Sequence, residues 1–179
     1  MTMTMTAIDV YRELLKTAHD ALDGTAAGVT PEQATWDPPG KAFSIAANYA
    51  HVVGSEDMAV QRLLRGKDMV AATSWAGRTG MSEMPPLGPG AGDLKAWSRQ
   101  AKVDLAALQQ YGQAVFAVTD EYVAGLSAEG LTRSVDLSVI GLGQQPVSFI
   151  LNALVVNAAM HCGETSCLKG IQGLKGYPM

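Results

Sequence analysis

Apolar residues recur at spacings of three and four along four segments of this chain, and clusters of glycine and proline separate the segments. That period places the apolar side chains on one face of an α-helix. Weak apolar and polar alternation between Gly130 and Pro146 predicts a short strand or hairpin. The chain is therefore expected to be all-α with a small β insert before its last helix. The predicted helices cover about 8–23, 44–66, 93–126 and 147–170.

The second and third predicted helices are joined by residues 67–92, a connection rich in glycine and proline. Connections longer than about 12–15 residues without secondary structure are uncommon in compact domains, so we expect this one to cross the bundle or to cover an opening. Four helices with one such connection indicate a four-helix bundle with a crossover between its second and third helices. All 179 residues are expected to form one domain, with residues 1–6 as a disordered N-terminal tail.

Composition and charge exclude several classes of protein. Hydrophobic residues make up 47% of the chain and charged residues 17%, against about 25% charged in ordinary globular proteins, which excludes a disordered chain. The net charge is -4 and the basic residues are scattered singly, so no nucleic-acid partner is expected. The long uncharged stretch 137–163 contains a proline, two asparagines and a histidine, so it does not predict a membrane span.

The N-terminal sequence and the cysteines indicate a cytoplasmic protein. The first residues lack the basic start and the apolar run of a signal peptide. Cys162 and Cys167 lie five residues apart in one predicted helix, about 8 Å between Cα atoms, which is too far for a disulfide. Two free thiols, both expected to be small buried side chains, suit a reducing compartment.

The last predicted helix carries polar residues within its apolar face. Burying an amide, an imidazole and a carboxylate costs about 1–3 kcal/mol each unless they find partners, so partners are expected to converge there. Seven residues share this face at spacings of four and three: Ile150, Leu154, Asn157, His161, Glu164, Leu168 and Ile171.

The second predicted helix carries a comparable polar stripe, formed by Asn48, His51 and Ser55. If the two faces meet, His51 and His161 come together. The alternatives are that one stripe faces water, or that both histidines are hydrogen-bonded core residues. His19 lies at the edge of the apolar stripe of the first helix, where it could lean inward as a third imidazole, but a place at the surface edge is the better-supported expectation.

Two motifs resemble the DinB-like (DinB/YfiT-like) family of metalloenzymes. The first is WDPPGKAFSI at 36–45, six residues ahead of His51, and the second is HCGE at 161–164, leading into LKG at 168–170. The order and spacing match over nearly the whole chain. The resemblance implies a four-helix bundle that holds a divalent metal through one histidine on the second helix and two histidines, four residues apart, on the last.

Within that pattern, His51 matches the first ligand position and His161 the last, whereas Asn157 stands where the family has its middle histidine. The implied metal set is therefore His51, Asn157 and His161, and the implied metal is nickel or zinc. Both metals prefer imidazole, and an uncharged amide oxygen is a poor ligand for either. Glu164, one turn further on, could serve as a ligand, as a catalytic proton carrier, or only as a structural acceptor for His161.

Two functions follow from these residues. The first is a metal-dependent enzyme, a thiol-dependent transferase or hydrolase, since some members of the resembled family use a low-molecular-weight thiol. The alternative is a bundle without metal that binds a small molecule or acts as a dimeric interaction module, which Asn157 favours. In both cases we expect a homodimer, because the apolar stripes and low charge indicate more apolar surface than one bundle encloses.

Overall fold

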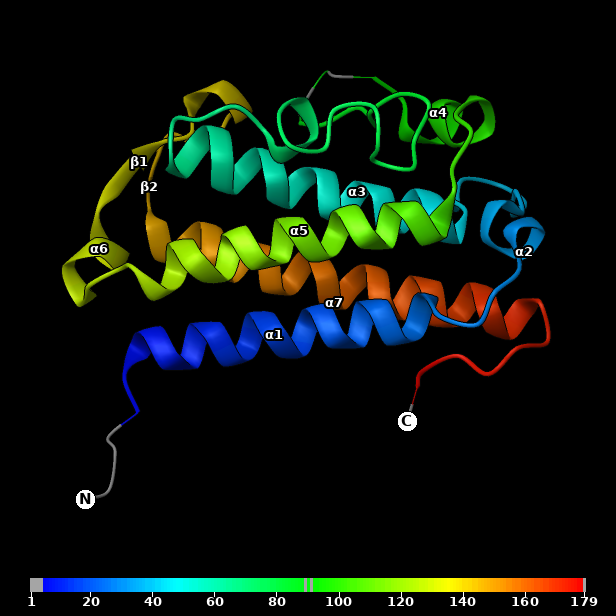
Figure 1. Cartoon of the computed structure of the whole chain (residues 1–179), viewed down its shortest axis with the longest axis horizontal. Helices are drawn as coiled ribbons and strands as arrows, with labels where there is room; N and C mark the ends of the chain where they lie inside the picture. The colour runs from blue at the N-terminus through cyan, green and yellow to red at the C-terminus, as the bar shows by residue number, and fades with distance from the viewer. Residues whose placement is uncertain (1–4, 89, 91, 179) are drawn as a thin grey trace.

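Four long helical segments dominate the computed structural model, which describes residues 5–88, 90 and 92–178 (Figure 1). Helices α1 and α3 each pack against both α5 and α7, so the four segments enclose a common core. This arrangement confirms the predicted helical bundle. The segments are α1 (Ala7–Ala26), α3 (Ile45–Asp57) with its π-helical continuation η1 (Met58–Leu64), α5 (Leu105–Ala124) and α7 (Val147–Ile171).

Helices α3 and α5 run in the same direction (Figure 1). Asp23, near the end of α1, accepts hydrogen bonds from Tyr49 in the first half of α3 and from Gln113 in the first half of α5. Two parallel helices need a connection that returns along the whole bundle. Residues 65–104 make that return, which confirms the predicted crossover, and they include η2 (Val70–Ala72) and α4 (Leu94–Gln100).

Asp57, the last residue of α3, fastens the connection to the bundle. Its carboxylate is fully buried and accepts hydrogen bonds from the backbone N–H groups of Val70 and Ala71, at 2.9 and 3.0 Å. The hydroxyl group of Tyr111 in α5 donates to the same carboxylate at 2.6 Å. Trp75 packs against the Tyr111 ring, with 6.2 Å between centroids. One buried carboxylate therefore joins α3, the connection and α5.

The third predicted helix, 93–126, is wrong as a single element, because residues 101–104 separate α4 from α5. In this break the backbone N–H of Asp104 donates to the carbonyl of Gly80 at 2.8 Å. Gly80 has a φ of +77°, and a Cβ there would lie 2.4 Å from the backbone nitrogen of Leu108. The apolar period runs through the break, but backbone pairing with the connection interrupts the helix.

The remaining short elements include the predicted hairpin, in which β1 pairs antiparallel with β2, with Ser134 opposite Pro146. Ser44 caps α3, as the sequence indicated. Thr6 caps α1 in a capping box with Asp9, whereas residues 1–4 of the predicted tail lie outside the described residues. The short elements are α2 (Pro31–Thr35), α6 (Ala128–Thr132), β1 (Ser134–Asp136), η3 (Ser138–Ile140) and β2 (Gln144–Pro146).

The first resemblance motif, residues 36–45, is fastened by a buried lysine of α4. The Lys95 ammonium pairs with the Asp37 carboxylate and donates to the carbonyls of Pro38 and Ala42, at 3.1 and 2.6 Å. This contact lowers the pKa of the Asp37 carboxyl. The motif therefore fixes the start of α3, and with it the place of His51 in the bundle.

Helix α7 is long and apolar enough to cross a membrane by length and composition alone, with a mean hydropathy of 1.2. A third of that window, 33%, is buried against the bundle. Core helices of soluble proteins pass the same test, so this property is weak evidence for a span.

Candidate functional site

Two histidines meet where α3 packs against α7. The rings of His51 and His161 lie edge to face, with 5.0 Å between their centroids and an interplanar angle of 69°. The polar faces of the second and last predicted helices therefore meet at these two rings, which is the first of the possibilities that the spacing left open. Since α3 and α7 run antiparallel (Figure 1), the residues that follow His51 face those that precede His161.

Glu164 orients the ring of His161. The Nδ1 atom of His161 lies 2.7 Å from a carboxylate oxygen of Glu164, one turn further along α7. The His161 side chain is 14% exposed and that of Glu164 is 51% exposed, so the pair lies at the mouth of the site. When Nδ1 donates to the carboxylate, Nε2 keeps its lone pair for a substrate proton or for a metal.

His51 contributes a second imidazole with an uncommitted nitrogen. Its Nδ1 atom is buried and has no hydrogen-bond partner in the described part of the chain. Burial lowers the pKa of His51, and the neighbouring His161 lowers it further. The ring is therefore neutral near pH 7, where it can accept a proton or bind a cation.

Asn157 lies on the same helix as His161 and reaches a neighbouring cavity. It lies one turn before His161 and, with Ser55 from α3, lines an apolar cavity of about 270 Å³. Its side-chain amide forms no hydrogen bond with any residue that the structure describes. The structure thus brings His51, His161 and Glu164 together, whereas it places Asn157 in the wall of the neighbouring apolar cavity, which neither histidine lines.

These side chains do not form a complete set of metal ligands. In the described ranges, no group of three or more His, Cys, Asp and Glu side chains is arranged to hold a metal ion. Glu164 is engaged with His161, and Asn157 offers only an amide, which leaves two imidazoles. A catalytic zinc usually has three protein ligands, so the residues present do not fit a tightly held nickel or zinc ion.

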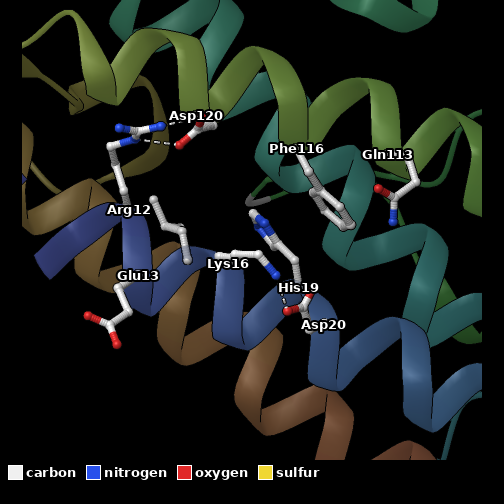
Figure 2. A pocket seen from close by; sticks show the side chains of 9 residues that line it. Arg12, Glu13, Lys16, His19, Asp20, Gln113, Phe116 and Asp120 are labelled. Carbon is white, nitrogen blue, oxygen red and sulfur yellow. Dashed lines mark hydrogen bonds and ion pairs between the residues drawn. The ribbon is translucent and has the colours of Figure 1, made fainter. Parts of the chain in front are cut away.

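The expectation that His19 lies at the surface edge is wrong, because its side chain is buried inside the bundle (Figure 2). Its Nε2 atom is 2.9 Å from a carboxylate oxygen of Glu56, and its ring stacks on Phe116 with 3.7 Å between centroids. The spacing of His19 could not show that a carboxylate of α3 lies opposite. His19 belongs to this polar pair and is not a third imidazole beside His51 and His161.

A cavity of about 630 Å³ between α1 and α5 lies over the His19 ring (Figure 2). Its rim carries two ion pairs, Arg12 with Asp120 at 2.7 Å and Lys16 with Asp20 at 2.5 Å. Exposed pairs of this kind contribute about 0–1 kcal/mol. These rim pairs therefore add little to stability, whereas the buried His19 and Glu56 pair joins α1 to α3.

Sequence reasoning missed the two buried carboxylates of α3, Glu56 and Asp57, which are 1% and 0% exposed. A signal was present, because two adjacent acids end a helix that has no other acidic side chain and no lysine or arginine. The side chains of adjacent helical residues point about 100° apart. A helix that exposes only a narrow face therefore cannot expose both acids, and at least one of them must be buried. Their partners, however, come from α1, α5 and the connection, which local sequence does not reveal.

The apolar face of α7 and its thiols follow the prediction only in part. Leu168 is buried, but Ile171 is 64% exposed because the helix ends beyond the bundle core. Both cysteines are free, as expected. Cys162 is buried against the Thr25 hydroxyl at 3.1 Å, whereas Cys167 is exposed and not the buried side chain expected.

The fold and the site define a class: helical bundles with a crossover and an imidazole site between two antiparallel helices. Residues 14–165 match the DinB superfamily, and the chain belongs to that superfamily. The structure is also similar to the crystal structure of a conserved protein from Enterococcus faecalis, with a TM-score of 0.76 and 18% sequence identity. That match covers 93% of this chain and 96% of the other, and at this identity it shows the fold alone. No match is found among curated proteins.

Proposed function

We propose that this DinB superfamily protein is an acid–base enzyme for a small-molecule substrate, in which His51, His161 and Glu164 carry the chemistry without a tightly held metal ion. The observation that supports this function is the hydrogen bond between His161 Nδ1 and the Glu164 carboxylate, beside the ring of His51, whose Nδ1 has no partner among the described residues. A carboxylate that orients an imidazole is the arrangement that general bases use in hydrolysis and transfer reactions.

The reaction class is hydrolysis, or transfer to a low-molecular-weight thiol. His161 Nε2 takes the proton of the attacking water or thiol, and the Glu164 carboxylate stabilises the imidazolium that forms. His161 then returns the proton to the leaving group. The His51 ring lies against His161, with 5.0 Å between the ring centroids, and borders the reacting groups.

A second candidate is the metal-dependent, thiol-using enzyme that the motifs indicated. The observation in its favour is the buried Nδ1 of His51, which has no partner among the described residues although a buried imidazole nitrogen normally has one. Members of the superfamily often bind metal. With two imidazoles and an amide, His51, His161 and Asn157 would hold nickel or zinc weakly, and the metal would polarise the substrate.

Hydrolysis of p-nitrophenyl acetate by protein purified without a polyhistidine tag separates the two candidates. We expect the protein to accelerate hydrolysis equally with and without EDTA. His161→Gln and Glu164→Gln should lose at least about tenfold in rate, since a positioned general base contributes about 10²–10⁴-fold. Glu121→Gln, an exposed change on α5, is the matched control and should leave the rate unchanged.

Two results would contradict the first candidate. Loss of activity in EDTA with recovery on adding zinc favours the metal-dependent enzyme. A wild-type rate equal to that of the Glu164→Gln variant removes the acid–base role of this site.

We also infer that the protein is a homodimer that pairs through the outer face of α7. Val156 and Met160 are 54% and 63% exposed and lie one turn apart on that helix. Exposed apolar patches of this kind mark association surfaces, and two-fold dimers are the commonest oligomers. Light scattering after gel filtration should give twice the chain mass, and Met160→Glu should give the monomer mass. A monomer mass for the wild type at all concentrations contradicts this inference.

A further inference from the structure

We propose that Asn157 and Ser55 are substrate-contacting residues that set specificity, and that the site accepts an uncharged carbonyl compound with a short aliphatic or aromatic body. This inference rests on the proposed function, because it places the reacting carbonyl beside the histidine pair. It gives Asn157 a role other than that of a defective metal ligand.

The apolar body of the substrate has a place in a cavity whose wall includes residues one helical turn from each histidine, Ser55 and Asn157. A cavity of about 270 Å³ opens between the end of α3, the hairpin and α7. Met58, Leu63, Leu137, Phe149 and Leu154 are among the side chains that line it. An apolar pocket with a few placed polar groups is the usual form of a small-molecule site, and this one has room for a short chain or one aromatic ring.

The polar end of this cavity is formed by Ser55 and Asn157, which belong to its lining. Ser55 follows His51 by four residues, and Asn157 precedes His161 by four, so each lies one helical turn from a histidine. Both side chains are half-buried, and within the described part of the chain neither forms a side-chain hydrogen bond. Two hydrogen-bonding groups without side-chain partners therefore lie in the cavity wall, each one helical turn from an imidazole.

The charges at the site favour an uncharged substrate group over a carboxylate. The Asn157 amide and the Ser55 hydroxyl group are both neutral. The Glu164 carboxylate lies at the mouth, 2.7 Å from His161, and repels anions. The amide N–H groups of Asn157 and the hydroxyl group of Ser55 can donate hydrogen bonds to a carbonyl oxygen. Burying a neutral carbonyl group costs less free energy than burying a carboxylate, because no charge loses its hydration.

The identity of residue 157 has a direct chemical consequence. A histidine there would offer a lone pair to a metal, whereas the asparagine offers two N–H donors to a carbonyl oxygen. Asn157, one turn from His161, thus recognises the carbonyl group of an ester, amide or ketone substrate. The apolar part of that substrate occupies the cavity.

Binding of benzamide, followed by protein-observed NMR, tests this inference without requiring turnover. Benzamide carries a neutral carbonyl group and an aromatic ring, benzoate carries a charged group, and toluene lacks the carbonyl. We expect benzamide to bind at least about fivefold more tightly than either, the ratio that one or two hydrogen bonds supply. The shifted resonances should include those of Ser55, Asn157 and Leu154.

Two variants separate recognition of the carbonyl from occupation of the cavity. Asn157→Ala should weaken benzamide about fivefold and leave toluene unchanged, since it removes a hydrogen-bond donor only. Its control, Asn152→Ala, changes an exposed asparagine of the same helix. Ala153→Phe should abolish binding of both compounds because Ala153 lines the cavity. Its control is Ala159→Phe, at an exposed position of α7 outside the lining.

Several results would overturn the inference. Equal affinities for benzamide, benzoate and toluene remove carbonyl recognition, and unchanged binding to Asn157→Ala removes the role of that residue. Failure of benzamide to bind, together with a change of mass in Ala153→Phe by light scattering, shows that a second copy covers the cavity. In each case the esterase rates of His161→Gln and Glu164→Gln report separately on the proposed function, so the two failures are distinguishable.

Discussion

The two histidine–carboxylate pairs of this protein contain the same chemical groups but lie in opposite environments. The pair of His19 and Glu56 lies inside the bundle, with side chains 9% and 1% exposed, and its ring is stacked on Phe116. The pair of His161 and Glu164 opens at the surface, where the Glu164 side chain is 51% exposed. A buried pair holds helices together, whereas an open pair has a ring nitrogen available for chemistry.

The comparison extends to the neighbouring polar groups. Around the buried pair, Asp57 and Asp23 each accept hydrogen bonds from side chains of other elements. Around the open pair, His51 keeps an unpartnered nitrogen among the described residues, and Asn157 lines a cavity. Glu56 Oε1 in the buried pair also lacks a partner among the described residues, so exposure, and not hydrogen bonding alone, distinguishes the open pair as the candidate site.

The largest expected difference between the two regions is in stability. His19→Ala should lower the free energy of unfolding by about 3–5 kcal/mol, because it leaves the buried Glu56 carboxylate without a partner. His161→Ala should cost about 1 kcal/mol or less, since Glu164 is open to solvent. Urea unfolding of both variants gives the two values. Equal costs would show that the open pair is as structural as the buried one.

The open site should gain metal affinity from one substitution. Asn157→His places imidazoles at 157 and 161, on one face of α7 and beside His51. Each added ligand bond contributes about 3 kcal/mol in zinc sites, so zinc affinity should rise roughly a hundredfold. Calorimetric titration of both proteins, with elemental analysis, measures the change. Tight stoichiometric binding by the wild type would mean that Asn157 does not weaken the site.

Even an isosteric substitution of the anchoring residue Asp57 should destabilise the protein. The Asp57 carboxylate accepts hydrogen bonds from Val70, Ala71 and Tyr111. Asp57→Asn replaces one of its acceptor oxygens by an NH₂ group, which faces these donors and cannot accept from them. Loss of one charge-assisted hydrogen bond costs about 2 kcal/mol. Urea unfolding monitored by tryptophan fluorescence reports it, because Trp75 packs against Tyr111.

The matched control for this anchor is Asp68→Asn, an exposed change in the same connection, which should be neutral. If both variants have wild-type stability, the connection is held by its apolar contacts alone and Asp57 contributes little.

The smallest expected effect is a pH dependence at Asp23. Burial raises the pKa of its carboxyl above 3.8, although hydrogen bonds from Tyr49 and Gln113 oppose the shift. The folded protein therefore keeps this proton to a higher pH than the unfolded chain, and stability falls as the pH rises from 3.8 through the folded-state pKa.

Asp23→Asn lacks this titration, so its stability relative to the wild type should rise over that pH window, by about 0.5 kcal/mol or less for a group still partly solvated. Urea unfolding of both proteins between about pH 3.5 and 7, in steps of about half a pH unit, measures the difference. Parallel profiles for the two proteins would show that burial does not penalise the Asp23 carboxylate.

Much of the fold could be predicted from local pattern. The periodic apolar stripes located α1, α3 and α7 to within a few residues, and Ser44 marked the start of α3. The break between α4 and α5 could not be predicted, because Asp104 pairs with Gly80, which lies 24 residues away along the chain. Periodicity reports which face is apolar, not which backbone groups find partners elsewhere.

The candidate site divides in the same way. The spacings of His51, Asn157, His161 and Glu164 placed these side chains on two helix faces, because helical geometry depends only on sequence separation. Whether the two faces meet depends on how α3 packs against α7, and only the tertiary structure decided that. The same packing determined that His19 faces a buried carboxylate and that Asn157 adjoins an apolar cavity. Sequence fixes the direction of a side chain on its own helix, but burial and partners depend on residues distant in the chain.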